Sequence, residues 1–269
     1  MKRFALIVGL QLIAFWDVWR WYISRAVYSW DQPWGLLAFI AALLFLLVSK
    51  KSFPRQEKCS VLLPSLVIVA YAASTYFGLP RLAQATIAFT ALALTLSHLR
   101  FGKSLHPGLF GLFYLSLPAI PSLQFFAGYP LRIVVAELTA PILRLGGFAV
   151  TTEGTCLNWG GQLIWIDAPC SGIKMLWVGM FLTFVLVCLY ELPVLKTIVL
   201  LPLAFVVILV ANVFRAVALF YLEAGVLRLP PWGHEYAGLI AFALEAAAIV
   251  FMAFRLQRGD ACGEPLPST

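Results

Sequence analysis

Charged side chains are scarce in this sequence. Lys, Arg, Asp and Glu make up 12% of its 269 residues, whereas 62% of the residues are hydrophobic and the mean hydropathy is +0.93. Soluble globular domains usually carry about 25% charged residues. The composition therefore excludes a soluble domain and predicts an all-α polytopic membrane protein.

Three other features are missing. The five cysteines include no Cys-x-x-Cys pair and have no histidine nearby at metal-ligand spacing, so neither a zinc site nor any other cofactor is expected. The first apolar run carries Asp17 and Arg20 where a signal peptide would have a small-residue cleavage site, so we expect it to remain as an anchor. No internal repeat is evident, which disfavours the duplicated architecture of many transporters.

Basic residues are in excess, and the formal net charge is +7. The Lys and Arg residues fall in short loops between apolar runs, so they indicate membrane topology and not a nucleic-acid partner. The densest basic loop covers residues 50–58 and is predicted to be cytoplasmic by the positive-inside rule. From that loop, both termini are predicted to be cytoplasmic.

The apolar runs predict about eight membrane spans in one integral membrane domain, residues 1–256, followed by a disordered cytoplasmic tail at 257–269. The expected spans cover residues 4–22, 34–48, 61–77, 82–96, 108–118, 172–190, 198–221 and 236–254.

One long stretch, residues 124–168, contains no clean span. Within it, residues 131–145 carry Arg132, Glu137 and Arg144 and predict a small amphipathic helix at the outer membrane surface. Residues 148–166 alternate apolar with polar side chains between glycines, which predicts one or two short strands or a hairpin at the outer face.

A potential nucleophile stands where the sixth predicted span begins. Pro169 disfavours helix for the residue before it, and Ser171 is a preferred helix N-cap, so Cys170 should lie within one turn of a helix N-terminus. Unpaired backbone N–H groups and the helix dipole favour a thiolate there, and Lys174 would add to that field. The alternative is that Cys170 is a small, inert, buried side chain.

Two further ionisable groups are predicted at the same membrane face. Arg215 follows Ile198 by 17 residues, which places it roughly 26 Å across the membrane. His234 immediately precedes the last span, also outside. Taken singly, the arginine could snorkel to the interface and the histidine could be an interface residue. Together with Cys170 they predict a site for covalent catalysis, with a thiolate nucleophile, a histidine acid or base and an arginine that stabilises an oxyanion or orients a substrate carboxylate.

Supporting residues are expected on the same helices. Asn212 precedes Arg215 by three residues and shares its helix face. Glu235 adjoins His234. Glu245 lies on the same helical face as His234, about 16 Å deeper, and it is expected to form an ion pair or a hydrogen bond.

The ordered motifs resemble the exosortase/archaeosortase family. They are Ala168-Pro169-Cys170-Ser171-Gly172-Ile173-Lys174, then Asn212-Val213-Phe214-Arg215, then His234 before the last span. The resemblance covers residues 118–254 and implies a membrane cysteine transpeptidase in which Cys170 is the nucleophile, Arg215 the substrate or oxyanion ligand and His234 the acid or base. Pro169 in place of the usual alanine, and Lys174 in place of arginine, indicate a divergent subtype.

The resemblance also implies the partners and the location. The substrates would be exported proteins that end in a short motif such as Pro-Glu-Pro, a membrane span and a basic tail, cleaved at the outer face of the cytoplasmic membrane among its lipids. This subtype need not recognise Pro-Glu-Pro. Two other interpretations stay open. One is a transporter or lipid-binding scaffold with a non-catalytic cysteine, and the other is a Cys156–Cys170 disulfide, which requires α-carbons within about 7 Å.

Overall fold

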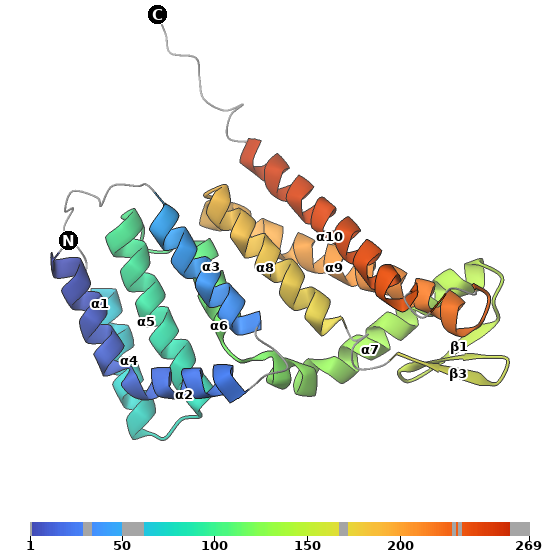
Figure 1. Ribbon diagram of the computed structural model, residues 1–269, viewed down its shortest axis with the longest axis horizontal. Coiled ribbons are helices and arrows are strands. Elements are labelled where there is room, and N and C mark those ends of the chain that lie inside the picture. The colour runs from blue at the N-terminus through green and yellow to red at the C-terminus, as the bar shows by residue number, and fades with distance from the viewer. Residues whose placement is uncertain are drawn as a thin grey trace, which may run out of the picture. The chain divides into compact units, whose positions relative to one another are not determined.

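The computed structural model describes residues 2–28, 34–49, 62–166, 172–227, 230 and 233–258. The chain divides into two compact units. Unit 1 comprises Met1–Ala119 with Phe184–Thr197, and unit 2 comprises Ile120–Thr183 with Ile198–Thr269. Helices dominate both units, and the described strands form one small sheet in unit 2 (Figure 1).

Unit 1 is built around an aromatic core. The ring of Phe89 lies within 6.2 Å of four other aromatic rings, those of Trp19, Tyr22, Phe39 and Phe113. Phe89 belongs to α5, and the ring-bearing helices pack around it. The helices that lie wholly in this unit are α1 (Lys2–Ala14), α2 (Trp16–Tyr28), α3 (Trp34–Val48), α4 (Leu62–Tyr76), α5 (Arg81–Phe101) and α6 (Pro107–Ser116).

The first predicted span is broken in the structure. Residues 4–22 were expected to form one helix, but α1 and α2 meet at a 70° bend next to Phe15. Phe15 is fully buried, and its ring packs against Tyr71 at 4.6 Å. The part after the bend carries Asp17 and Arg20, which are costly to hold in lipid. Burial of Phe15 and exclusion of these charges from the apolar layer both favour the bend.

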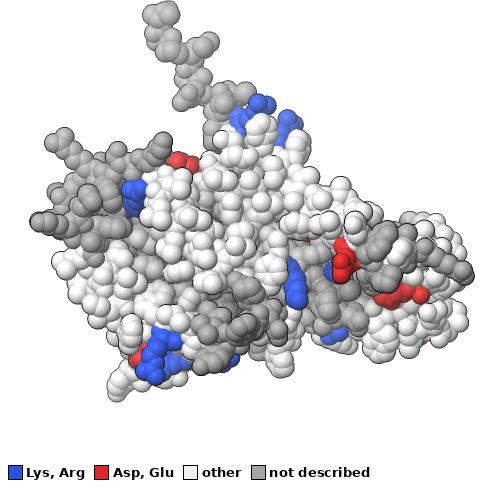
Figure 2. Space-filling model, in the orientation of Figure 1, with Lys and Arg blue, Asp and Glu red and all other residues white. Residues whose placement is uncertain are grey.

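The structure has the helices of a polytopic membrane protein. Within the described residues, four helices are long and apolar enough to cross a membrane, or five if the bent α1–α2 pair counts as one span. They are α5, α7 (Ile120–Leu145), α9 (Val194–Glu223) and α10 (Gly233–Arg258). The shorter apolar helices are α3, α4, α6 and α8 (Ile173–Leu189). Figure 2 shows charged atoms confined to a few places on the visible face. The count of eight spans stays a prediction.

Helix α7 differs from the predicted surface helix. It begins at Ile120, not at residue 131, and runs for 26 residues, so it is itself a candidate span. Pro121 falls in its first turn, where the missing N–H group is tolerated, so that proline starts a helix instead of ending one. Pro130 and Pro141 lie inside the helix. The charges of residues 131–145 belong to the part of α7 that contacts the sheet.

The strands predicted for residues 148–166 are confirmed, and there is a third. β1 (Val150–Glu153), β2 (Cys156–Trp159) and β3 (Gln162–Trp165) form an antiparallel sheet in the order β1-β2-β3. Val150 pairs with Trp159, and Cys156 pairs with Trp165. Gly160 and Gly161 both have positive φ angles, as a tight two-residue hairpin turn requires.

One face of the sheet is buried in the core of unit 2. Leu157 of β2 and Ile164 of β3 share this core with residues of α7 and with Ala216 and Phe220 of α9. Phe148 adds edge-to-face ring contacts with Trp159 at 5.7 Å and with Phe220 at 5.4 Å. The sheet is therefore fixed to the part of α9 that carries Arg215.

Candidate active site

Two of the predicted site residues, Cys170 and Ser171, lie outside the described residues. His234 is the second residue of α10, but its side chain also lies outside what the structure describes. The structure does describe Gly172 at the end of the cysteine motif, together with Lys174, Asn212, Arg215 and Glu235. All five belong to unit 2.

Within the described part of the cysteine motif, Gly172 lies against the side chain of Asn212. A Cβ atom at Gly172 would lie 2.6 Å from Asn212 Nδ2 and 2.9 Å from Asn212 Cγ, closer than side chains tolerate. The φ angle of Gly172 is +79°, which also disfavours any other residue. Asn212 is buried at 3% exposure. The glycine is thus required both for its backbone conformation and for the approach of the asparagine side chain.

Arg215 lies near the same place on α9, three residues after Asn212. Its side chain is half-buried, and a Cβ atom at Gly238 of α10 would lie in ordinary contact, 3.5 Å from Arg215 Nε. Gly238 follows His234 by four residues, which is about one helical turn. The structure therefore brings together the start of α8, the Asn212–Arg215 turn of α9 and the first turns of α10.

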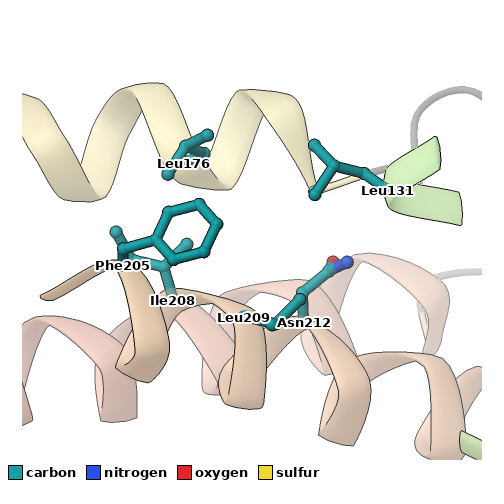
Figure 3. A pocket seen from close by; sticks show the side chains of 7 residues that line it. Leu131, Leu176, Phe205, Ile208, Leu209 and Asn212 are labelled. Atoms are coloured by element: carbon teal, nitrogen blue, oxygen red, sulfur yellow. The ribbon is translucent and has the colours of Figure 1, made fainter. Parts of the chain in front are cut away.

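A small cavity adjoins the Gly172–Asn212 contact. Its volume is about 20 Å³, enough for roughly one water molecule. Figure 3 shows Asn212 extending from α9 beside this cavity, and the remaining walls are apolar. They are formed by Leu131, Leu176, Phe205, Ile208 and Leu209. Asn212 is the only polar side chain among the described residues that line it.

Lys174 and Glu235 are less confined. Lys174 lies exposed in the first turn of α8, and Glu235 lies exposed in the first turn of α10. Both positions are therefore open to solvent or to a second molecule. Among the described residues, no group of three His, Cys, Asp or Glu side chains could hold a metal ion.

The prediction for Glu245 was wrong. Its side chain is 1% exposed, and neither carboxylate oxygen has a hydrogen-bond partner among the described residues. It lies against α8, where a Cβ atom at Gly179 would overlap Glu245 Oε1 and would come within 2.7 Å of Ile208. Helix periodicity gives the direction of Glu245 around α10, but it does not specify what the facing helices supply.

Two glycines at helix contacts, Gly179 and Gly238, were not predicted as site residues. Gly179 follows Gly172 by seven residues, two turns along one face of α8, and Gly238 faces Arg215. Small residues at helix contacts let membrane helices approach closely. A glycine inside an apolar helix is the sequence signal that points to Gly179.

The disulfide alternative involves Cys156, which lies buried in β2. Cys156 forms no disulfide with another described residue. Its predicted partner, Cys170, lies outside the described residues, so this pairing stays a prediction.

The fold and these contacts define a class: a helical, multi-pass membrane protein in which three helices bring polar groups together near their ends. Comparison with known families is more specific. A family model of transmembrane exosortases matches residues 3–252, and the chain belongs to that family. No curated protein and no solved structure matches the chain.

Proposed function

We propose that this exosortase is a cysteine transpeptidase or peptidase that cleaves the carboxy-terminal sorting signal of exported proteins through a Cys170 thioester. Membership of the transmembrane exosortase family over residues 3–252 carries the proposal. The substrates would end in a short motif, a membrane span and a basic tail. No cofactor takes part.

The residue roles follow from the chemistry. The Cys170 thiolate attacks the scissile carbonyl carbon, and Arg215 stabilises the negative charge on its oxygen or orients a substrate carboxylate. The carbon–nitrogen bond then breaks, and His234 gives a proton to the departing amine. Water or an acceptor amine attacks the resulting thioester and restores the thiol. Asn212, Ser171, Lys174 and Glu235 support this machinery.

Local geometry supports these roles. Gly172, against which Asn212 packs, stands two residues after Cys170. Arg215 lies one turn along α9 from Asn212 and contacts α10 one turn from His234.

The proposed topology has eight spans, with both termini in the cytoplasm and the site on the outer face of the cytoplasmic membrane. Residues 1–256 form the membrane domain, with the site in 118–254, and residues 257–269 form the tail. The basic loop at 50–58 and the basic last turn of α10, with Arg255 and Arg258, support this orientation. A basic tail on the substrate would remain on that same cytoplasmic side.

The test is to express candidate substrates with the wild-type chain and with Cys170→Ser and Cys170→Ala. The wild type should form a substrate-sized thioester adduct, released by hydroxylamine, and neither variant should form it. Cleavage should fall on the order of 10⁴-fold or more, as for other lost nucleophiles. Cys188→Ala, at a buried cysteine of unit 1, is the control and should keep the adduct. Full function of Cys170→Ala would instead support a transporter or lipid-binding scaffold.

A further inference from the structure

The two edges of the small sheet differ in how they are covered. On β1, Arg144 Nε donates to the backbone oxygen of Val150 at 2.8 Å, and Thr152 Oγ1 donates to Glu137 Oε1 at 2.8 Å. Both partners come from α7, so this helix covers the β1 side. On the β3 side, the described residues provide no further strand. The backbone hydrogen bonds here are the ladder with β2 and one bond just after β3, in which Ile166 N donates to Thr155 O at 3.0 Å.

The open strand is short, at four residues, but it lacks the other usual protections of an edge. Exposed edge strands normally carry a charge, a proline or a bulge, which prevents pairing with other chains. Gln162-Leu163-Ile164-Trp165 has none of these. Leu163 and Trp165 are 43% and 60% exposed, whereas Ile164 between them is 5% exposed. Among the described residues, β3 therefore presents backbone groups without partners beside apolar side chains.

The position of β3 indicates what pairs with it. Cys170 follows Trp165 by five residues in the sequence. Ile164 shares its buried core with Ala216, the residue next to Arg215 on α9. The open edge is thus linked to two of the proposed catalytic residues, to one by the chain and to the other by packing.

We infer that β3 binds the substrate segment next to the scissile bond as a fourth, extended strand. This inference rests on the proposed function. Backbone hydrogen bonds would supply most of the affinity, and Leu163 and Trp165 would contact alternate side chains of the bound segment. A second copy of this chain could also pair with the free edge of β3. It would then cover the strand that precedes Cys170 in the chain, and the substrate could not pair there.

The first experiment is photo-crosslinking in membranes with the full-length chain carrying Cys170→Ala, so that substrate binds without reacting. A benzophenone amino acid replaces Leu163 or, as a matched control, Thr151, an exposed residue of β1 in the same sheet. The probe is a candidate substrate that forms the thioester with the wild type. Position 163 should crosslink to the residues around the cleavage site with about tenfold higher yield than position 151, the ratio expected for a difference of about 1.4 kcal/mol.

Equal yields at positions 163 and 151, or a crosslink joining two copies of this chain at 163, would overturn the inference. A substrate that forms the thioester but does not crosslink at position 163 would overturn only the binding mode. Absence of the thioester from the wild type would instead contradict the proposed function.

The second experiment leaves the enzyme unchanged, so misfolding of a variant cannot affect it. Peptides covering the cleavage segment are made with single amide-to-ester replacements, each of which removes one backbone N–H donor. A strand paired on β3 uses every second donor. Cleavage should fall about tenfold for replacements at alternate positions and change little between them, because one hydrogen bond contributes about that factor. Equal effects at all positions would contradict strand pairing.

Discussion

The two units use glycine at helix contacts for different purposes. In unit 1, the space left by Gly111 of α6 is filled by the ring of Phe184. In unit 2, the corresponding spaces beside Gly172 and Gly179 are filled by the Asn212 amide and the Glu245 carboxylate. Close helix packing therefore serves an aromatic core in one unit and holds polar groups in the apolar interior of the other.

This difference predicts that stability and catalysis can be separated. Phe89→Ala in unit 1 should destabilise the fold by about 3–5 kcal/mol, because it removes the ring around which four others pack. Activity per folded molecule should stay close to that of the wild type. Thermal unfolding in detergent, with activity normalised to the folded fraction, measures both quantities. Phe125→Ala, at an 80% exposed side chain, is the control and should change stability by less than about 0.5 kcal/mol.

Arg215→Gln in unit 2 should have the opposite effect. Loss of one group that stabilises an oxyanion typically lowers kcat by about 10²–10³-fold, and the half-buried side chain should contribute little to unfolding. Cleavage rates and thermal unfolding are measured on the same preparation. Arg255→Gln, in the last turn of α10, is the matched control and should retain activity. Wild-type cleavage by Arg215→Gln would remove this residue from the mechanism.

Gly172→Ala tests the contact with Asn212. Gly147→Ala is a matched control, because Gly147 also has a positive φ angle, +89°, but nothing lies within 4 Å of an added Cβ atom. Gly147→Ala should cost about 1–2 kcal/mol for backbone strain alone. Gly172→Ala should cost about 1–3 kcal/mol more, because it also overlaps Asn212. The double variant Gly172→Ala/Asn212→Ala should recover only the stability that is lost through the overlap. The coupling energy between the two substitutions measures that part. Equal losses for both glycines would show that the contact is unimportant.

The smallest effect is expected at Glu245. Glu245 is buried and has no hydrogen-bond partner among the described residues. Replacing such a carboxyl group with an apolar side chain of similar size should stabilise the fold, so Glu245→Leu should gain about 1–3 kcal/mol. Thermal unfolding of Glu245→Leu is compared with that of Glu235→Leu, because Glu235 is exposed on the same helix and its change should stay within about 0.5 kcal/mol. A loss of stability at Glu245 would reveal a hydrogen-bond partner among residues that the structure does not describe.

Much of the fold could be predicted from the sequence. The predicted span at 34–48 coincides with α3, and the predicted span at 172–190 differs from α8 by one residue at each end. Hydropathy is a local property, so it locates apolar helices well. It failed at Phe15 and at the start of α7, where burial of one ring and a proline in the first helical turn decide the outcome.

The candidate site could be predicted in part. The motifs containing Cys170, Asn212, Arg215 and His234 could be recognised in the sequence, and the family match agrees with that recognition. The proximity of Gly172 to Asn212 and of Gly238 to Arg215 required coordinates, because each pair joins two helices. The absence of a hydrogen-bond partner for Glu245 among the described residues could not be inferred, because helix periodicity does not specify what neighbouring helices supply.

The sequence by itself determined that this protein is a multi-pass membrane protein of helices, because hydrophobicity acts over neighbouring residues. Only the tertiary structure decided which glycine admits which polar side chain, and that α7 covers one edge of the sheet while no described strand pairs with the other. Those features depend on contacts between segments far apart in the chain, and no local pattern encodes such contacts.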